Sequence, residues 1–212
     1  MNFNLFRYLA LGDSLTVGVG VPIWDPGFVE YYRGVSQRII KEPLLYQKYA
    51  ISGATTEDVL NFTYSQIVTE AIKCANIITI TAGGDDLINA ARQFIMDENK
   101  EDILHAIKQS QKNYINLLER IHRMDKQDKY IIRLMTLYNP FPDIPVVDEA
   151  IKRFNVLIKS FGRETNVKVA DIYSVFKGNE QGLLSKGGVH PNSKGYYQMA
   201  LDFSRLGYSP LV

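Results

Sequence analysis

The sequence predicts an α/β fold in which a five-stranded parallel sheet lies between two layers of helices. Short apolar segments of strand length alternate five times with longer amphipathic segments, and this alternation is typical of parallel strands joined by helical crossovers. The 212 residues are 46% apolar, enough for one buried core. We find no linker or internal repeat, so we expect a single domain over residues 1–212.

Five segments are expected to be strands because apolar and β-branched residues follow one another in short runs. They are residues 8–11, 44–50, 76–82, 130–135 and 167–172. Five other segments place apolar residues three or four positions apart, which is the spacing of one helical face. They are residues 28–40, 56–72, 103–124, 147–161 and 192–203.

The composition argues against several functional classes. The formal charge is +1, so no basic field would attract nucleic acid. No segment approaches the roughly 20 apolar residues of a membrane span. The one cysteine, Cys74, cannot form an internal disulfide and is expected to be an inert buried thiol. A core-like strand follows Arg7 at once, without room for a signal peptide, so we expect a cytoplasmic protein, or a secreted one if a leader was removed.

The glycine-rich segments do not match nucleotide-binding patterns. After Gly18-Val19-Gly20, Ile23 stands where a dinucleotide fingerprint requires a third glycine. Gly83-Gly84 is followed by two acids that would repel a phosphate, and no Lys-Ser/Thr pair follows. We therefore expect no nucleotide cofactor.

Polar residues and glycines follow the first three predicted strands, at the edge where ligands bind in open α/β sheets. The first strand leads into Gly12-Asp13-Ser14-Leu15, the second into Ser52-Gly53-Ala54-Thr55 and the third into Gly83-Gly84-Asp85-Asp86. Taken singly, each segment is as easily a turn or a helix cap. Together they place a serine, turn glycines and carboxylates at one edge of the sheet.

His190 is the histidine whose surroundings indicate a chemical role. It lies in Gly187-Gly188-Val189-His190-Pro191-Asn192, a loop before a helix that Asn192 could cap. His105 and His122 belong to a polar amphipathic helix and are expected to be exposed. A serine nucleophile requires a base within hydrogen-bond reach and donors for the developing oxyanion. The strand-end segments and His190 could supply both.

In these four segments the sequence resembles the GDSL/SGNH hydrolase family. Residues 12–15 match its nucleophile block, Gly53 its second block, residues 83–86 its third and His190 its fifth. The resemblance implies a three-layer α/β/α sandwich of flavodoxin-like type and a serine esterase or acylhydrolase that needs no cofactor or metal. It implies Ser14 as nucleophile of an acyl-serine mechanism, His190 as base, and Ser14, Gly53 and residue 85 as the oxyanion hole. The partner would be a small ester or acyl substrate, and no oligomeric state is implied.

Two positions depart from the family pattern. Asp85 replaces the oxyanion-hole asparagine, and an ionised carboxylate accepts hydrogen bonds but cannot donate them; losing one such donor costs about 10²–10³ in rate. Gly187 replaces the aspartate that orients the histidine, a loss that can cost about 10⁴. His190 would then need a backbone carbonyl, a water or another carboxylate, and Asp171 is a candidate by location. Acid that neutralises Asp85 would also protonate His190, so we expect pH alone to restore little activity.

Two other functions remain as alternatives. The first is a catalytically weak or inactive family member that binds a ligand in the same pocket. The second is a metal site formed by Asp13, Asp85 and Asp86, as a Mg²⁺-dependent phosphatase would need. The metal alternative leaves Ser14 and His190 without a role.

Three residues are expected to contact the substrate. Asp13 adjoins the serine, and the aromatic residues Trp24 and Phe141 lie in the loops after the first and fourth predicted strands. Both loops belong to the edge of the sheet that carries the site. The sequence therefore predicts an apolar substrate pocket bordered by these side chains.

Overall fold

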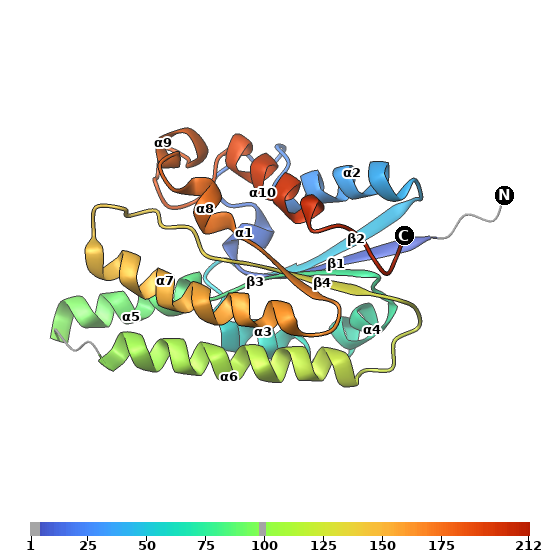
Figure 1. Cartoon of the computed structure of the whole chain (residues 1–212), viewed down its shortest axis with the longest axis horizontal. Helices are drawn as coiled ribbons and strands as arrows, with labels where there is room; N and C mark the ends of the chain where they lie inside the picture. Colours follow the sequence, from blue (N-terminus) through green and yellow to red (C-terminus); the bar gives the residue numbers. More distant parts are fainter. Residues whose placement is uncertain (1–4, 98–100) are drawn as a thin grey trace.

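The computed structural model describes residues 5–97 and 101–212 and confirms the α/β/α sandwich (Figure 1). Five parallel strands form one sheet in the order β2-β1-β3-β4-β5, which is the flavodoxin-like order. Their bounds are Phe6–Gly12 for β1, Leu44–Ala50 for β2, Ile77–Thr81 for β3, Ile131–Met135 for β4 and Val167–Ala170 for β5.

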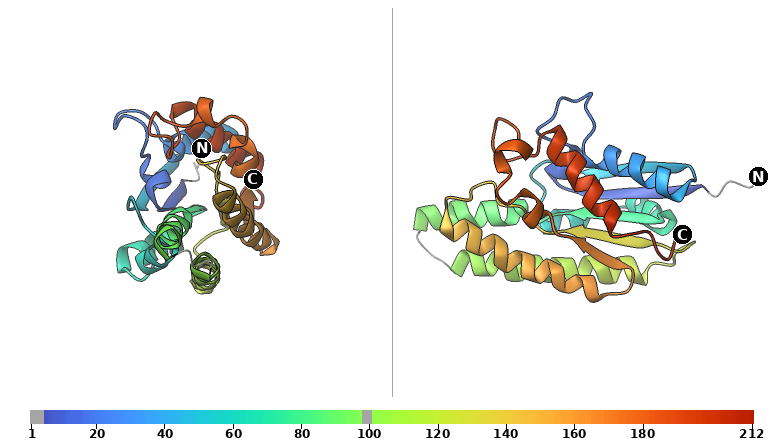
Figure 2. Two further views of the ribbon diagram at one scale, coloured as in Figure 1. Left: turned by 90° about the vertical axis from the view of Figure 1, so that its left-hand side faces the viewer. Right: turned by 45° about the horizontal axis from the view of Figure 1, so that its top comes forward.

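Alternate residues of each strand face opposite helical layers. Leu9 and Leu11 of β1 belong to one buried cluster, whereas Tyr8 and Ala10 belong to the other. The first cluster is covered by α3 (Thr56–Phe62), α4 (Gln66–Cys74), α5 (Gly84–Asp97), α6 (Glu101–Arg123) and α7 (Pro145–Ser160). The second is covered by α1 (Ser14–Val17), α2 (Phe28–Ile40), α8 (Ile172–Phe176) and α10 (Ser193–Arg205). Figure 2 shows the two layers on either side of the sheet, which explains why the strands are apolar on both faces.

The predicted helix over residues 56–72 is wrong, because the structure has two helices there. The Thr63 hydroxyl donates to the Leu60 carbonyl at the end of α3, and the Ser65 side chain accepts from the Val68 N–H at the start of α4. These local bonds satisfy backbone groups at the break. The fifth strand also ends earlier than predicted, at Ala170, because Asp171 caps α8.

Several local expectations need correction. Helix α5 was not predicted, although Leu87, Ala90 and Phe94 have helical spacing. Cys74 is partly rather than fully buried. His105 is exposed as expected, but His122 is half-buried and its Nδ1 lies 2.7 Å from the Tyr130 hydroxyl. Within the two described ranges, no helix combines the length and the apolar character needed to cross a membrane.

The register of the sheet brings three strand ends together. Gly12, the last residue of β1, is level with Ala50 of β2 and Thr81 of β3. The loops after these strands therefore start at the same edge. This is the edge that carries the predicted functional residues.

Candidate active site

Ser14 is the first residue of α1 and follows directly on β1. The turn depends on Gly12, because a Cβ there would lie 2.1 Å from Thr81 Oγ1 and 2.6 Å from the Thr81 carbonyl oxygen. The Asp13 carboxylate then caps α1, accepting from the Leu15 N–H at 3.0 Å and from the Thr81 hydroxyl at 2.7 Å. These buried contacts fix Ser14 at the carboxyl edge of the sheet.

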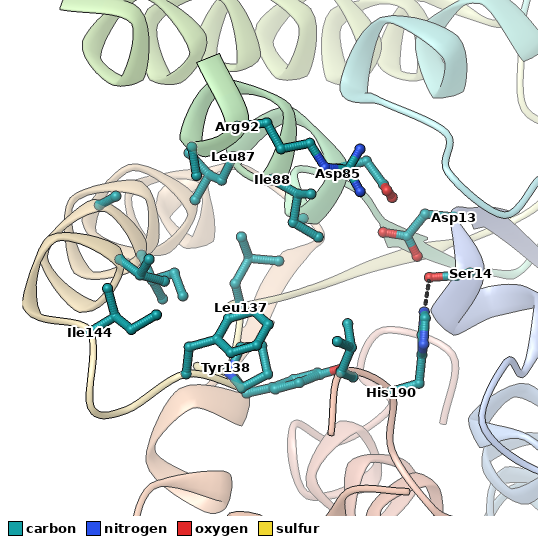
Figure 3. A pocket seen from close by; sticks show the side chains of 18 of the residues that line it. Asp13, Ser14, Asp85, Leu87, Ile88, Arg92, Leu137, Tyr138, Ile144 and His190 are labelled. Carbon is teal, nitrogen blue, oxygen red and sulfur yellow. Dashed lines mark hydrogen bonds between the residues drawn. The ribbon is translucent and has the colours of Figure 1, made fainter. Parts of the chain in front are cut away.

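His190 lies beside Ser14, and its Nε2 is 2.9 Å from the Ser14 Oγ (Figure 3). In the tautomer that carries its proton on Nδ1, Nε2 accepts the serine hydroxyl. This distance is within the range that a nucleophile and its base require. The structure thus brings together the two residues that the sequence proposes as nucleophile and base.

The backbone around His190 is held from several sides. The Ser185 N–H donates to the His190 carbonyl at 2.8 Å, and the Tyr138 hydroxyl donates to the Val189 carbonyl at 2.6 Å. A Cβ on Gly20 would lie 2.8 Å from the His190 Cβ and 2.5 Å from the Pro191 carbonyl oxygen. Gly20, unexplained by the sequence patterns, therefore allows the first loop to pack against the histidine.

No hydrogen bond in the described part of the chain joins the His190 ring to a carboxylate. Asp171 does not take this role, because its carboxylate binds Lys159 Nζ at 2.8 Å and the Ser174 hydroxyl at 2.9 Å. Gly187 lies in open space, where the nearest atom to an added Cβ is Ser185 Oγ at 4.0 Å. Among the residues that the structure describes, the arrangement is therefore a serine–histidine pair without a third, acidic member.

Gly53 and Asp85, the other expected oxyanion-hole residues, line the same cavity as Ser14 and His190. Gly53 has a φ of +87°, a left-handed conformation that favours glycine. Burial raises the pKa of Asp85 above its ordinary value, and the charge of Asp86 adds to this shift. Burial also lowers the pKa of His190, although the nearby Asp85 partly offsets that shift.

Asp86 has a structural position rather than a place beside the serine. Its carboxylate accepts from the Thr56 N–H at 2.8 Å, the Thr56 hydroxyl at 2.7 Å and the Ser110 hydroxyl at 3.1 Å. It therefore satisfies the N–H group of the first residue of α3 and links α3, α5 and α6. Among the residues that the structure describes, no group of three or more His, Cys, Asp or Glu side chains is placed to hold a metal ion. The geometry gives no support to the metal site proposed from Asp13, Asp85 and Asp86.

The site opens into a cavity of about 650 Å³. Asp13 and Phe141 line it, as expected of substrate-contact residues. Trp24 does not: it is 82% exposed in the loop over residues 18–27 and is not among the lining residues. Much of the cavity wall comes from α5 and α7. The apolar wall residues of α5 were not identified from the sequence, because that helix was not predicted.

The chain is similar to known proteins over most of its length. A family model described as the GDSL-like Lipase/Acylhydrolase family matches residues 10–198. The chain is 38% identical over 207 residues to the spore germination lipase LipC of Bacillus licheniformis, covering 97% of this chain and 98% of the relative. Among solved structures, the lipase Lip_vut3 from a goat rumen metagenome matches with a TM-score of 0.94 and 38% identity, covering 98% of this chain and 100% of that chain. A variant of the acetyl xylan esterase Axe2 of Geobacillus stearothermophilus matches with a TM-score of 0.72 at 19% identity, covering 94% and 93%, and so shows the fold alone.

Asp13→Asn is expected to stabilise the protein at pH 8. Burial is the main cause that raises the pKa of Asp13 from 3.8 to about 6. A raised pKa in the folded state means that wild-type stability is lost as pH rises from about 4 to about 6. Asparagine cannot ionise and retains an acceptor for the Leu15 N–H, so the gain in unfolding free energy at pH 8 is up to about 3 kcal/mol. Denaturant titrations at pH 4 and pH 8 measure it, and an equal gain at both pH values would contradict this account.

Proposed function

Because this chain belongs to the GDSL-like lipase/acylhydrolase family, we propose that it hydrolyses carboxylic esters through an acyl intermediate on Ser14, with His190 as general base and acid. The observation that carries the proposal is the 2.9 Å contact between Ser14 Oγ and His190 Nε2. The neutral imidazole needed for a base is favoured by burial, which lowers the pKa of His190.

The proposed reaction has two halves. The Ser14 oxygen attacks the ester carbonyl carbon while His190 Nε2 takes the hydroxyl proton, and this proton then passes to the leaving alcohol as the ester bond breaks. In the second half a water attacks the acyl-serine and gives its proton to His190. The carboxylic acid leaves as His190 returns the proton to Ser14, so the enzyme is regenerated.

We assign the oxyanion to the backbone N–H groups of Ser14 and Gly53. Both residues line the cavity, and neither N–H donates a hydrogen bond within the described ranges. Such free donors can stabilise the charge of the tetrahedral intermediate. Asp85 is the third group near this position, and it opposes the oxyanion whenever it is ionised.

We further propose that His190 works without an orienting carboxylate. The bonds from Ser185 and Tyr138 to its loop, and the close packing of Gly20, restrict its backbone. They do not stabilise the charged imidazolium as a buried aspartate would. The second candidate function is that of a weak or inactive family member that binds a ligand. The missing orienting carboxylate and the carboxylate of Asp85 in place of a donor both favour it.

Ser14→Ala is expected to lower kcat on a short p-nitrophenyl ester by at least about 10³-fold, because it removes the nucleophile. The substitution deletes one hydroxyl, so the melting temperature should change little. Steady-state hydrolysis by purified wild type and variant, with thermal unfolding of both, is the measurement. Turnover that survives in the variant contradicts the assignment of Ser14. A wild type without turnover supports the second candidate.

Gly187→Asp is expected to raise kcat about tenfold or more, because a carboxylate three residues before the histidine can orient it and stabilise its charged form. An added side chain meets open space at this position. The measurement is kcat of wild type, Gly187→Asp and Lys186→Asp on one ester. Lys186→Asp is the control, because it adds a carboxylate to the same loop one residue away. An unchanged or lower kcat in Gly187→Asp would show that the loop cannot use the acid.

Asp85→Asn is expected to raise kcat/KM about 100-fold near neutral pH, because an amide donates to the oxyanion at every pH. In wild type, kcat/KM should follow a bell-shaped pH profile, because catalysis needs a neutral His190 and a protonated Asp85 at the same time, and only a protonated carboxyl can donate. The raised pKa of Asp85 and the lowered pKa of His190 bring the two titrations closer together. Acid therefore restores more activity than the sequence alone predicts, and the gain from asparagine shrinks toward low pH.

The measurement is a pH profile of kcat/KM for wild type, Asp85→Asn and the control Asp143→Asn, which removes an exposed charge from the loop beside Phe141. A fall in kcat/KM for Asp85→Asn at every pH would mean that Asp85 acts as a working carboxylate. An equal gain in the control would mean that general charge, and not the oxyanion position, is responsible.

A further inference from the structure

The cavity extends well beyond the Ser14–His190 pair. In Figure 3, Ser14 and His190 lie at one end and Ile144 lies across the cavity from them. Along α5 the lining residues run from Gly84 to Phe94, and the part from Asp85 to Phe94 corresponds to about 13 Å at the helical rise. An ester whose carbonyl lies at Ser14 would therefore have a long channel on one side.

The two ends of the cavity differ in polarity. The polar groups gather around Ser14, whereas the walls toward α7 are formed by side chains such as Ile88, Leu137 and Val147. The Tyr138 hydroxyl is turned to the Val189 carbonyl, so its ring is what this wall presents. Arg92 also lines the cavity, but its side chain is exposed to solvent. A wall of this kind favours an uncharged, apolar group.

Near the end of the lining segment of α5, three helices contribute apolar side chains to the wall. Phe94 of α5, Ile103 of α6 and Ala150 of α7 line the cavity; Ile103 and Ala150 belong to one small apolar cluster, and Phe94 packs against it. Ile103 and Ala150 are buried. Because Ala150 carries a single methyl group, a larger side chain there would shorten the channel.

We propose that this channel, formed by α5, α7 and the loop between β4 and α7, holds the acyl chain of the substrate, and that Ile103 and Ala150 set its maximum length. The inference rests on the proposed function, because it places the scissile carbonyl at Ser14. An extended chain advances about 1.2 Å per bond, so about 13 Å accommodates roughly ten carbons. The substrate class is thus esters of medium-chain fatty acids.

The test compares kcat/KM for p-nitrophenyl esters from acetate to tetradecanoate. In wild type, kcat/KM should rise up to about fourfold for each buried methylene until the channel is filled near decanoate, and then stop rising. Ala150→Phe should lower kcat/KM for the decanoate ester at least tenfold more than it lowers kcat/KM for the acetate ester. Ile103→Ala should move the optimum toward longer chains, so the two variants act in opposite directions.

Val156→Phe is the matched control, because Val156 lies on the same helix but is 72% exposed and does not line the cavity. Its chain-length profile should equal that of wild type. A wild-type profile that does not depend on chain length, or profiles of Ala150→Phe and Ile103→Ala that match the control, would overturn the proposal.

Binding of decanoate to Ser14→Ala, measured by calorimetry, separates this inference from the proposed function because it needs no turnover. We expect binding that weakens at least tenfold when Ala150→Phe is added. If decanoate binds and its binding weakens when Ala150→Phe is added, but the wild type hydrolyses none of the esters, the proposed channel is supported and the proposed ester hydrolysis is wrong. If the wild type hydrolyses p-nitrophenyl acetate but decanoate shows no measurable binding to Ser14→Ala, the proposed acyl channel is wrong and the proposed hydrolase activity stands.

Discussion

The site depends on one hydrogen bond, between Ser14 Oγ and His190 Nε2, which joins residues 176 positions apart in the sequence. Ser14 is held by the end of a buried central strand and by the bonds between Asp13 and Thr81. The His190 loop packs against Gly20, which follows the serine by only six residues. The first strand and its loop thus position both partners, so the pair is assembled by the fold itself.

The electrostatics of the site differ from those of a serine–histidine–aspartate triad. The buried Asp13 is engaged in hydrogen bonds with Leu15 and Thr81 and has a raised pKa, so its burial is costly when it ionises. Asp85 lines the same cavity, and in the proposed mechanism a hydrogen-bond donor in its place would stabilise the oxyanion better. The histidine relies on backbone contacts for its position. The geometry brings the serine and the histidine together, and we propose that the charges around them limit catalysis.

Much of the fold and the serine–histidine pair could be predicted because the signals are local. The apolar segments are short and regular, and turn glycines flank Ser14 and His190 at strand or helix ends. What could not be predicted depends on distant contacts. Asp86 accepts from the first N–H group of a helix that begins 30 residues earlier, and the exposure of Trp24 depends on the direction of its loop. The helix over residues 84–97 begins at a glycine, a poor helix former, so its start resembles a turn.

The central claim is that Ser14, activated by His190, is the nucleophile. The most direct measurement is peptide mass spectrometry of the protein after treatment with a fluorophosphonate, which phosphonylates activated serines. The account predicts one phosphonyl group on Ser14 of the wild type and labelling at least 100-fold slower when His190→Ala removes the base. Phosphonylation of another serine, or labelling of Ser14 at the same rate without His190, would contradict it.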